Sequence, residues 1–342
     1  MVTFESDYNN GAHPEVLRRL IETNSDSSAS YGYDVWSQSA RNKIRTACQC
    51  PDADVFFLVG GTQTNAVVID ALLPSYGAVI AVSTAHINVH ESGAIEACGH
   101  KVITLPSHQG KMAATELKAY LERFYADPTW EHMAVPGMVY MTFPTELGTV
   151  YKATEIEAIH EVTSQYNIPL FIDGARLGYG LASADCDFDL PWLAGQCEAF
   201  YIGGTKVGAL CGEAVVFTKQ APRGFFTMVK RHGALLAKSR LAGVQFDALF
   251  TDGLYLRIAH HAIDMALRLR DIFTKAGIPL RNSPTNQQFV ELTSQQMRQL
   301  MQHVLFETWE PIDADRTLCR FVTSWATTEN DLQELSDALK TI

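Results

Sequence analysis

The sequence predicts an α/β fold with a mostly parallel central sheet, followed by a smaller α+β domain. Short apolar runs between residues 54 and 218 have the length of strands, and amphipathic helical patterns separate them. Near-continuous apolar strands that alternate with helices are typical of a parallel sheet covered on both faces. After about residue 245 the alternation changes, which indicates a second unit.

Composition is consistent with a compact globular protein and excludes several other classes. The chain has 342 residues, which at roughly 150 residues per domain favours about two domains. Hydrophobic residues make up 47% and charged residues 19%, which excludes a disordered chain. The net charge is -11, so nucleic-acid binding through a basic face is not expected. No apolar stretch reaches the ~20 residues of a membrane span, so no membrane association is expected.

The N-terminus and the cysteines favour a reduced, intracellular location. Residues 1–10 include Glu5 and Asp7 and lack the basic and apolar segments of a secretory signal, so we expect a cytoplasmic protein. The 7 Cys are scattered, which fits free thiols better than a disulfide framework. Cys48 and Cys50 form the one close pair, and their spacing matches neither a zinc motif nor a redox motif. No metal site is therefore predicted.

The predicted large domain spans residues 1–245. Pro14 opens an expected helix over 14–23, because proline favours the first helical position, and a second helix is expected over 38–47. The expected strands are 55–60, 78–83, 101–105, 138–143, 170–173, 199–203 and 214–218. The helical patterns between them are 64–73, 91–98, 115–126 and 154–166.

The predicted small α+β domain spans residues 246–342. A long helix is expected over 254–275, with Gly277 just beyond it as the C-terminal cap glycine. Strands over 288–292 and 320–325 then flank a helix over 294–304, and a last helix is expected over 329–339.

Ligands of open parallel sheets gather beyond the carboxyl ends of the strands, so the residues after each strand are the candidates for a binding site. Residues 60–65, Gly-Gly-Thr-Gln-Thr-Asn, lie between a strand and a helix, where backbone and hydroxyl donors can hold a phosphate. The same residues fit an ordinary capped turn. They match neither the Walker loop nor the dinucleotide signature.

An acid, a lysine and a histidine follow three other strands. Asp173 ends an apolar strand, and its partner is either Arg176 in a structural ion pair or the protonated ring nitrogen of a cofactor. Lys206 lies in a glycine-rich turn, where it is either a solvated loop residue or an amine with a lowered pKa suited to Schiff-base chemistry. His86 stands three residues after Ser83, where it is either a structural or a catalytic imidazole.

Together, a phosphate loop, an acid, a strand-end lysine and an imidazole are the parts that hold pyridoxal 5'-phosphate. The sequence resembles the threonine aldolase and β-eliminating lyase family of fold-type I pyridoxal-phosphate enzymes. The resemblance extends from Ser6-Asp7 to Arg320-Phe321-Val322-Thr323. It implies the fold of the pyridoxal-phosphate-dependent transferases.

The resemblance implies a role for each site residue. Lys206 would form the Schiff base with the cofactor, Asp173 would pair with its pyridine nitrogen, and His86 would stack on its ring. The phosphate would be bound by Gly61, Thr62 and, across a subunit interface, Arg240. The substrate carboxylate would be held by Ser6, Arg176 and Arg320, since a guanidinium offers a carboxylate two parallel hydrogen bonds.

One segment departs from the family pattern. Threonine aldolases commonly have Asn-Thr-His near the active site, whereas residues 142–148 here read Thr-Phe-Pro-Thr-Glu-Leu-Gly. Glu146 could take over the role of the missing histidine as a base or contact, or it could be a surface residue. The residues leave both open.

The implied activity is cleavage of the Cα–Cβ bond of a β-hydroxy-α-amino acid to glycine and an aldehyde. A β-elimination or a transamination on the same cofactor is the alternative, because those reactions would use Lys206 and Asp173 equally. A pyridoxal-fold binding protein without catalysis is a further alternative. The resemblance also implies a homodimer or homotetramer with active sites at the subunit interface.

Overall fold

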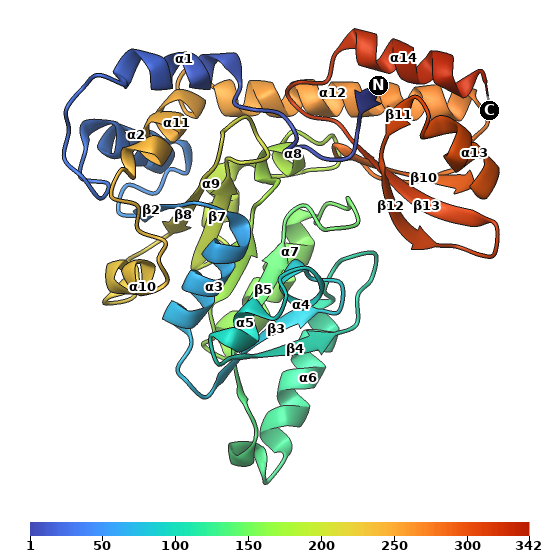
Figure 1. Cartoon of the computed structure of the whole chain (residues 1–342). Coiled ribbons are helices and arrows are strands. Elements are labelled where there is room, and N and C mark those ends of the chain that lie inside the picture. Colours follow the sequence, from blue (N-terminus) through green and yellow to red (C-terminus); the bar gives the residue numbers. More distant parts are fainter. Residues whose placement is uncertain (342) are drawn as a thin grey trace.

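The computed structural model describes residues 1–341, whose largest element is a seven-stranded sheet with the order β2-β8-β7-β6-β5-β3-β4 (Figure 1). The pairs β3–β4, β3–β5, β5–β6 and β6–β7 are parallel, and β8 is antiparallel to both neighbours. This confirms the predicted mostly parallel sheet. Its strands are β2 Asp54–Leu58, β3 Gly77–Val82, β4 Lys101–Leu105, β5 Val135–Thr142, β6 Leu170–Asp173, β7 Ala199–Gly203 and β8 Glu213–Phe217.

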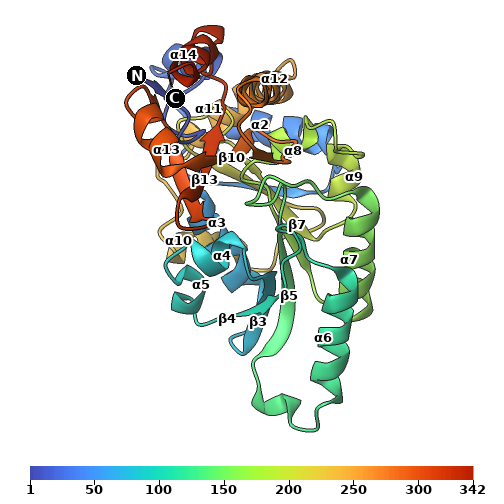
Figure 2. The ribbon, with the colours of Figure 1, turned by 90° about the vertical axis from the view of Figure 1, so that its right-hand side faces the viewer.

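Helices cover both faces of this sheet, as the apolar strands require. Figure 2 shows α3 Gly61–Leu72 with α4 and α5 on one side of the strands. Helices α6 Ala114–Ala126 and α7 Ala153–Gln165 lie on the other, and the short 3-10 helix η1 Trp130–His132 follows α6.

One predicted helix was wrong in its extent. Instead of a single helix over 91–98, the chain forms α4 His86–Val89 and α5 Ala94–Ala97. Between them Ser92 has φ 52° and Gly93 has φ 73°. Left-handed backbone cannot continue a right-handed helix, so the pattern is interrupted there.

Four helices were not predicted from the sequence. They are α8 Leu177–Leu181, α9 Leu190–Ala194, α10 Phe225–Arg231 and α11 Arg240–Leu249. The first three have only 5 to 7 residues, too few for a helical period to stand out. Helix α11 is buried at every residue over 242–249, including Gln245 and Asp247, so its polar residues do not mark a solvent-facing side.

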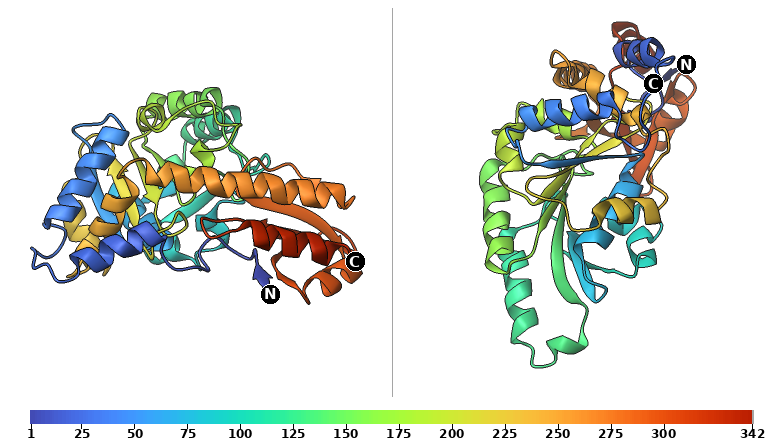
Figure 3. Two further views of the ribbon diagram at one scale, coloured as in Figure 1. Left: turned by 90° about the horizontal axis from the view of Figure 1, so that it is seen from above. Right: turned by 90° about the vertical axis from the view of Figure 1, so that its left-hand side faces the viewer.

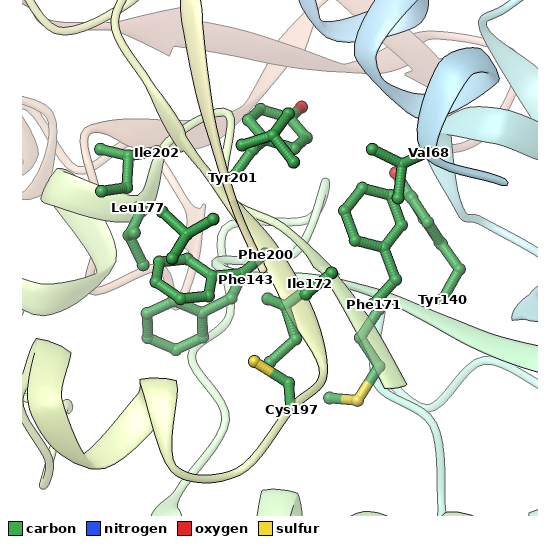
Figure 4. Packing of buried hydrophobic residues seen from close by; sticks show 14 of the residues in the cluster. Val68, Tyr140, Phe143, Phe171, Ile172, Leu177, Cys197, Phe200, Tyr201 and Ile202 are labelled. Carbon is green, nitrogen blue, oxygen red and sulfur yellow. The ribbon is translucent and has the colours of Figure 1, made fainter. Parts of the chain in front are cut away.

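The core of the large sheet is packed by side chains from both of its faces. Figure 4 shows Phe171 of β6 beside Val68 of α3 and Tyr140 of β5. Phe143 and Phe200 lie together in another part of the same cluster. These side chains are fully or almost fully buried, so they hold the strand ends that carry polar residues in fixed positions.

The N-terminal helices α1 Pro14–Thr23 and α2 Val35–Ala47 pack against α11. Pro14 opens α1 as predicted. Helix α2 begins earlier than the predicted residue 38, because the Asp34 carboxylate caps it by accepting a 2.8 Å hydrogen bond from the Ser37 N–H.

Helix α12 Leu254–Lys275 connects the two hydrophobic clusters of the molecule (Figure 3). Leu254 and Ile258 pack into the cluster of the large sheet, whereas Leu269 and Phe273 pack into the second cluster. Gly277 follows with φ 73°, which agrees with its predicted role at the helix end. The division of the chain after residue 245 stays a prediction.

The second cluster lies under an antiparallel sheet with the order β12-β13-β10-β9. Val2 and Phe4 also pack into it, and β1 pairs with β11, so the two ends of the chain lie close together (Figure 3). The elements are β1 Val2–Thr3, β9 Leu280–Arg281, β10 Gln287–Thr293, α13 Ser294–Leu300, β11 Val304–Leu305, β12 Glu307–Pro311, β13 Arg316–Val322 and α14 Glu329–Leu339.

Among residues 1–341, none of the helices combines the length and the apolar character that a membrane crossing demands. The expected cytoplasmic location stays a prediction.

Candidate active site

One pocket lies where the carboxyl ends of the parallel strands meet the first turn of α3. It brings together residues that are up to 154 positions apart in the sequence, from Val59 to Glu213. Six of the predicted site residues line it: Gly61, Thr62, His86, Asp173, Arg176 and Lys206. Ser6, Arg240 and Arg320 lie outside this lining.

The first turn of α3 presents an anion-binding surface. Its N-cap is Gly60, which has no side chain to satisfy the free N–H groups of the first turn. The Thr64 hydroxyl is buried and has no hydrogen-bond partner among residues 1–341. A Cβ at Gly61 would lie 3.1 Å from the Tyr201 hydroxyl, so only glycine leaves open backbone at this point. The helix dipole adds partial positive charge here.

Asp173 is a buried carboxylate held by neutral donors. It accepts hydrogen bonds from the Asn65 amide at 3.0 Å, the Tyr140 hydroxyl at 2.5 Å and the Ala175 N–H at 2.9 Å. The structural ion pair with Arg176, which the sequence left open, is absent from the described residues, where no cation lies within ion-pair distance of Asp173. A buried carboxylate without a cation is suited to a positively charged ligand.

A chain of hydrogen bonds connects Asp173 to His86. Asn65 donates to both Asp173 and Glu91, and the Glu91 carboxylate lies 2.7 Å from Nδ1 of His86. Because the carboxylate accepts from Nδ1, Nε2 of a neutral His86 ring keeps a free lone pair. The imidazole is therefore oriented as a base, with its other nitrogen available to a ligand.

Lys206 is half-buried in the pocket. Desolvation by burial, with the neighbouring charge of Arg176, lowers the pKa of its amine from 10.5 to about 8. Its backbone is held by the Tyr179 hydroxyl, which donates to the Lys206 carbonyl at 2.5 Å. At neutral pH a lysine of this kind supplies far more neutral amine than an exposed lysine does.

Glu213 holds the turn that precedes Lys206. It accepts hydrogen bonds from the Gly204 N–H at 3.1 Å and the Thr205 hydroxyl at 2.8 Å. Burial raises the pKa of Glu213 to about 8. Its charge in turn favours the protonated form of Lys206, so the two groups influence each other's titration.

Arg176 has a partner that the sequence analysis missed. Its Nε and Nη2 bind the Asp7 carboxylate at 2.7 Å and 3.0 Å, in a two-point pair. Burial alone would raise the pKa of Asp7, but the charges of Arg176 and Lys206 outweigh it and lower that pKa. Asn286 also donates to Asp7, at 2.9 Å. A substrate carboxylate at Arg176 would therefore share the guanidinium with Asp7.

Arg320 and Ser6 retain unpaired polar atoms. Arg320 binds Gln287 at 2.8 Å and Glu307, and its guanidinium lies 4.7 Å from the centre of the Trp309 ring. Its Nε and the Ser6 hydroxyl are buried without a partner among the described residues. Burial and the nearby Arg176 charge lower the pKa of Arg320, which shows how strongly these two cations affect each other. A bound carboxylate would offset that repulsion.

Glu146 is buried at the edge of the pocket, so it is not the surface residue that the sequence left open. One carboxylate oxygen accepts hydrogen bonds from the His86 N–H at 2.8 Å and the Thr142 hydroxyl at 2.7 Å. The other oxygen has no partner among residues 1–341. Burial raises the pKa of Glu146, although the hydrogen bonds from Thr142 and His86 act in the opposite direction.

Arg240 contacts its own chain away from this pocket. Its guanidinium donates to the carbonyls of Thr23 and Asp26, both at 2.5 Å, and lies 4.1 Å from the Trp36 ring centre. Within one chain it therefore holds the segment that follows α1. The role expected across a subunit interface stays a prediction.

Sequence reasoning missed several residues that shape the site: Asp7, Asn65, Glu91, Tyr140 and Glu213. Asp7 follows Ser6, and Asn65 ends the predicted phosphate segment 60–65, but the sequence assigned neither residue the partner that it has in the structure. Tyr140 is inside a strand, where a tyrosine side chain is expected to belong to the hydrophobic core. Only the folded chain aims its hydroxyl at Asp173.

Comparison with known families gives one match over most of the chain. Residues 4–308 match the model of the family described as beta-eliminating lyase. Two curated low-specificity L-threonine aldolases are 32% identical. The protein from a Pseudomonas species aligns over 281 residues, 81% of this chain and 79% of its own length. The Pseudomonas aeruginosa protein covers 79% of this chain and 77% of its own length.

Solved structures agree with this match. The threonine aldolase of Leishmania major has a TM-score of 0.94 at 36% identity, covering 100% of this chain and 99% of its own. A putative L-allo-threonine aldolase of Listeria monocytogenes has a TM-score of 0.77 at 16% identity, covering 99% of this chain and 96% of its own. An aspartate aminotransferase variant of Thermus thermophilus has a TM-score of 0.69 at 15% identity, with 99% and 96% covered. The last two matches bear on the fold alone, which is that of the fold-type I enzymes.

Proposed function

Because the chain belongs to the β-eliminating lyase family, we propose that it is a pyridoxal-phosphate-dependent lyase. It would cleave the Cα–Cβ bond of a β-hydroxy-α-amino acid to give glycine and an aldehyde. The observation that carries this proposal is the position of Lys206, whose amine has its pKa lowered to about 8 in the same pocket as Asp173. The threonine aldolase names of the relatives favour this reaction over elimination or transamination.

The residues of the pocket fit pyridoxal phosphate at three separated points. The first turn of α3, with Gly61, Thr62 and the unpaired Thr64 hydroxyl, suits the phosphate. Asp173, which has no cation partner among residues 1–341, suits a protonated pyridine nitrogen. Lys206 lines the same pocket and suits an aldehyde.

When bound, pyridoxal phosphate supplies an electron sink for the pair of electrons released at Cα. The Asp173 carboxylate would favour that role by holding a proton on the ring nitrogen. Tyr140 and Asn65 fix the carboxylate for this task through hydrogen bonds of 2.5 Å and 3.0 Å. Because both donors are uncharged, they do not neutralise the carboxylate, and its full negative charge is available to the ring nitrogen.

His86 is the group we assign to the β-hydroxyl proton. Glu91 lies 2.7 Å from Nδ1 and holds the ring with Nε2 available as a base. Removal of the hydroxyl proton drives formation of the aldehyde as the Cα–Cβ bond breaks. The ring would also stack on the cofactor, which places both roles on one side chain.

Ser6, Arg176 and Arg320 are proposed to hold the substrate carboxylate. The unpaired Ser6 hydroxyl and Arg320 Nε are buried donors that such a carboxylate would satisfy. A fixed carboxylate orients the Cα–Cβ bond relative to the ring, which is the geometric condition for breaking that bond and not another. We also propose a homo-oligomer in which Arg240 reaches a neighbouring site.

A product assay tests the reaction. The pyridoxal-phosphate-loaded protein is incubated with L-threonine, L-allo-threonine and phenylserine, and glycine, aldehyde, keto acid and ammonia are measured together. We expect equal amounts of glycine and aldehyde. Keto acid with ammonia would instead assign the enzyme to the eliminating lyases and overturn the aldol cleavage while leaving the cofactor pocket intact.

A further inference from the structure

A second cluster of metal-binding side chains lies at the opposite end of α3 from the pocket. The carboxylate of Asp70, the thiol of Cys98 and the imidazole of His232 each offer a donor atom, and these atoms all lie within 4.8 Å of one another. Asp70 is on α3, Cys98 follows α5 and His232 follows α10. No part of the proposed reaction uses these residues.

His100 faces the same carboxylate from outside this cluster. Its side chain is 2% exposed, and its Nδ1 lies 3.0 Å from the carbonyl of Gly77. A carbonyl can only accept, so Nδ1 carries the hydrogen and Nε2 of the neutral ring is an acceptor. That Nε2 lies 3.4 Å from Oδ1 of Asp70, which is also an acceptor. Two acceptors that face each other in a buried place are stabilised by a cation between them.

The local electrostatics also favour a cation. Asp70 is near the C-terminal end of α3, where the helix dipole is negative. The nearby positive group among the described residues is Arg231, whose Nη1 is 3.6 Å from Asp70, but its side chain is 68% exposed and free to turn into solvent. Nε2 of His232 lies 2.7 Å from Oδ2 of Asp70, a contact that a shared metal ion would replace.

We propose that Asp70, Cys98 and His232 form a binding site for a divalent ion of the zinc type, with water in the fourth position. A carboxylate, a thiolate and an imidazole are all ligands that Zn²⁺ binds, and three protein ligands leave one position of a tetrahedral site for water. A thiol and an imidazole disfavour Mg²⁺ and Ca²⁺, which prefer oxygen ligands. The carbonyl of Gly77 would orient His100 as an outer-shell partner.

Zinc at this site would join two separate segments, which carry Cys98 and His232, to the helix whose other end carries Gly61 and Thr62. Asp70 stands eight residues after Thr62, about 12 Å along the helix axis, so the ion would not touch the pocket. Its expected effect is on stability and not on the chemical step. Cys98 must lose its proton to bind the metal, so affinity is expected to rise with pH.

The test is a zinc titration of the full chain loaded with pyridoxal phosphate, after chelator treatment, followed by calorimetry and thermal unfolding. We expect one Zn²⁺ per chain and a higher unfolding temperature, with no response to Mg²⁺. Cys98→Ser and His232→Gln should each weaken binding by roughly tenfold or more, because even outer-shell losses cost that much. Cys50→Ser, which alters a cysteine outside the cluster, is the matched control and should bind zinc normally.

Cobalt gives a second readout that does not depend on stability. Co²⁺ bound at the site should produce a thiolate-to-metal charge-transfer band that disappears in Cys98→Ser and persists in Cys50→Ser. Zinc binding that is unchanged in both Cys98→Ser and His232→Gln, or no binding by the unaltered chain, would overturn the proposal. The result is independent of the aldol assay, since neither readout uses turnover.

Discussion

At the scale of single residues, Lys206 is the group on which the proposed chemistry depends. Replacing Lys206 with Ala should remove covalent attachment of pyridoxal phosphate, and with it the visible Schiff-base absorbance and all turnover. Absorbance spectroscopy after gel filtration measures the attachment. The control is Lys219→Ala, which alters an exposed lysine and should leave the spectrum unchanged. Turnover that survives in Lys206→Ala would disprove the assignment.

The titration of Lys206 predicts how cofactor capture depends on pH. Only the neutral amine attacks an aldehyde, so the rate of capture should rise with pH and level off above about 8, the pKa of Lys206. An exposed lysine would continue to gain rate up to pH 10 and beyond. Stopped-flow absorbance on the cofactor-free protein measures this profile.

Glu213 should influence the same profile. Its charge favours the protonated amine, so Glu213→Gln should lower the pKa of Lys206 further and move the midpoint of the profile to lower pH. The control Glu96→Gln alters an exposed carboxylate on α5 and should leave the midpoint in place. A midpoint that moves upward in Glu213→Gln would contradict this electrostatic account.

His86 and Glu146 are predicted to respond differently to substitution. Glu146 accepts hydrogen bonds from the His86 N–H and the Thr142 hydroxyl, and a glutamine amide oxygen can accept the same bonds, so Glu146→Gln should keep kcat within roughly tenfold. His86→Phe keeps an aromatic face for stacking but no base, so it should lower kcat by roughly a hundredfold.

Exchange of the α-hydrogens of glycine in D₂O, followed by NMR, separates an effect on the β-hydroxyl proton from an effect on the chemistry at Cα. Glycine has no β-hydroxyl, so both variants should still catalyse this exchange if His86 acts on the hydroxyl proton. If Glu146→Gln loses aldol cleavage as severely as His86→Phe does, Glu146 is the base and the assignment of His86 is wrong.

At the scale of elements, the close approach of α11 to α2 depends on a glycine. A Cβ at Gly243 would lie 2.2 Å from the Ser37 hydroxyl and 2.8 Å from the Ser37 backbone. Gly243→Ala should therefore destabilise the fold by roughly 1–3 kcal/mol, measured by denaturant unfolding. Gly11→Ala, where the added Cβ would meet nothing within 4 Å, is the control. Equal free energies of unfolding for the two variants would show that α2 and α11 can move apart without loss of stability.

The elements also show where sequence patterns were sufficient to predict the secondary structure. Every predicted strand of the large sheet is present, because strands buried on both faces are apolar along their whole length. Helix α11 was not predicted, because its polar residues Gln245 and Asp247 are buried and do not mark a solvent-facing side. The division between α4 and α5 depends on the left-handed backbone at Ser92, a conformation that the presence of a serine does not predict.

At the scale of the whole molecule, the proposed oligomer can be tested by mixing two inactive variants. Lys206→Ala lacks its own lysine, and Arg240→Ala lacks the arginine that would serve a neighbouring site. A mixed oligomer contains one site with both residues intact, so activity should return when the two proteins are mixed and allowed to exchange subunits. Activity assays on the mixture measure this. No recovery, with subunit exchange confirmed, would confine Arg240 to its contacts with Thr23 and Asp26.

The sequence by itself determined the type of fold and the site residues that stand at or after the end of an apolar strand. Lys206, Asp173 and His86 each follow an apolar strand, and the carboxyl ends of parallel strands meet at one edge of a sheet. Local order along the chain was therefore enough to place them in one pocket.

Only the tertiary structure decided their partners. It paired Arg176 with Asp7, 169 positions away, in place of Asp173, and it connected Asp173 to His86 through Asn65 and Glu91. It also brought His232 to Asp70, 162 positions away. Such contacts depend on distances and side-chain directions that arise after the layers pack, and neither spacing nor composition records them.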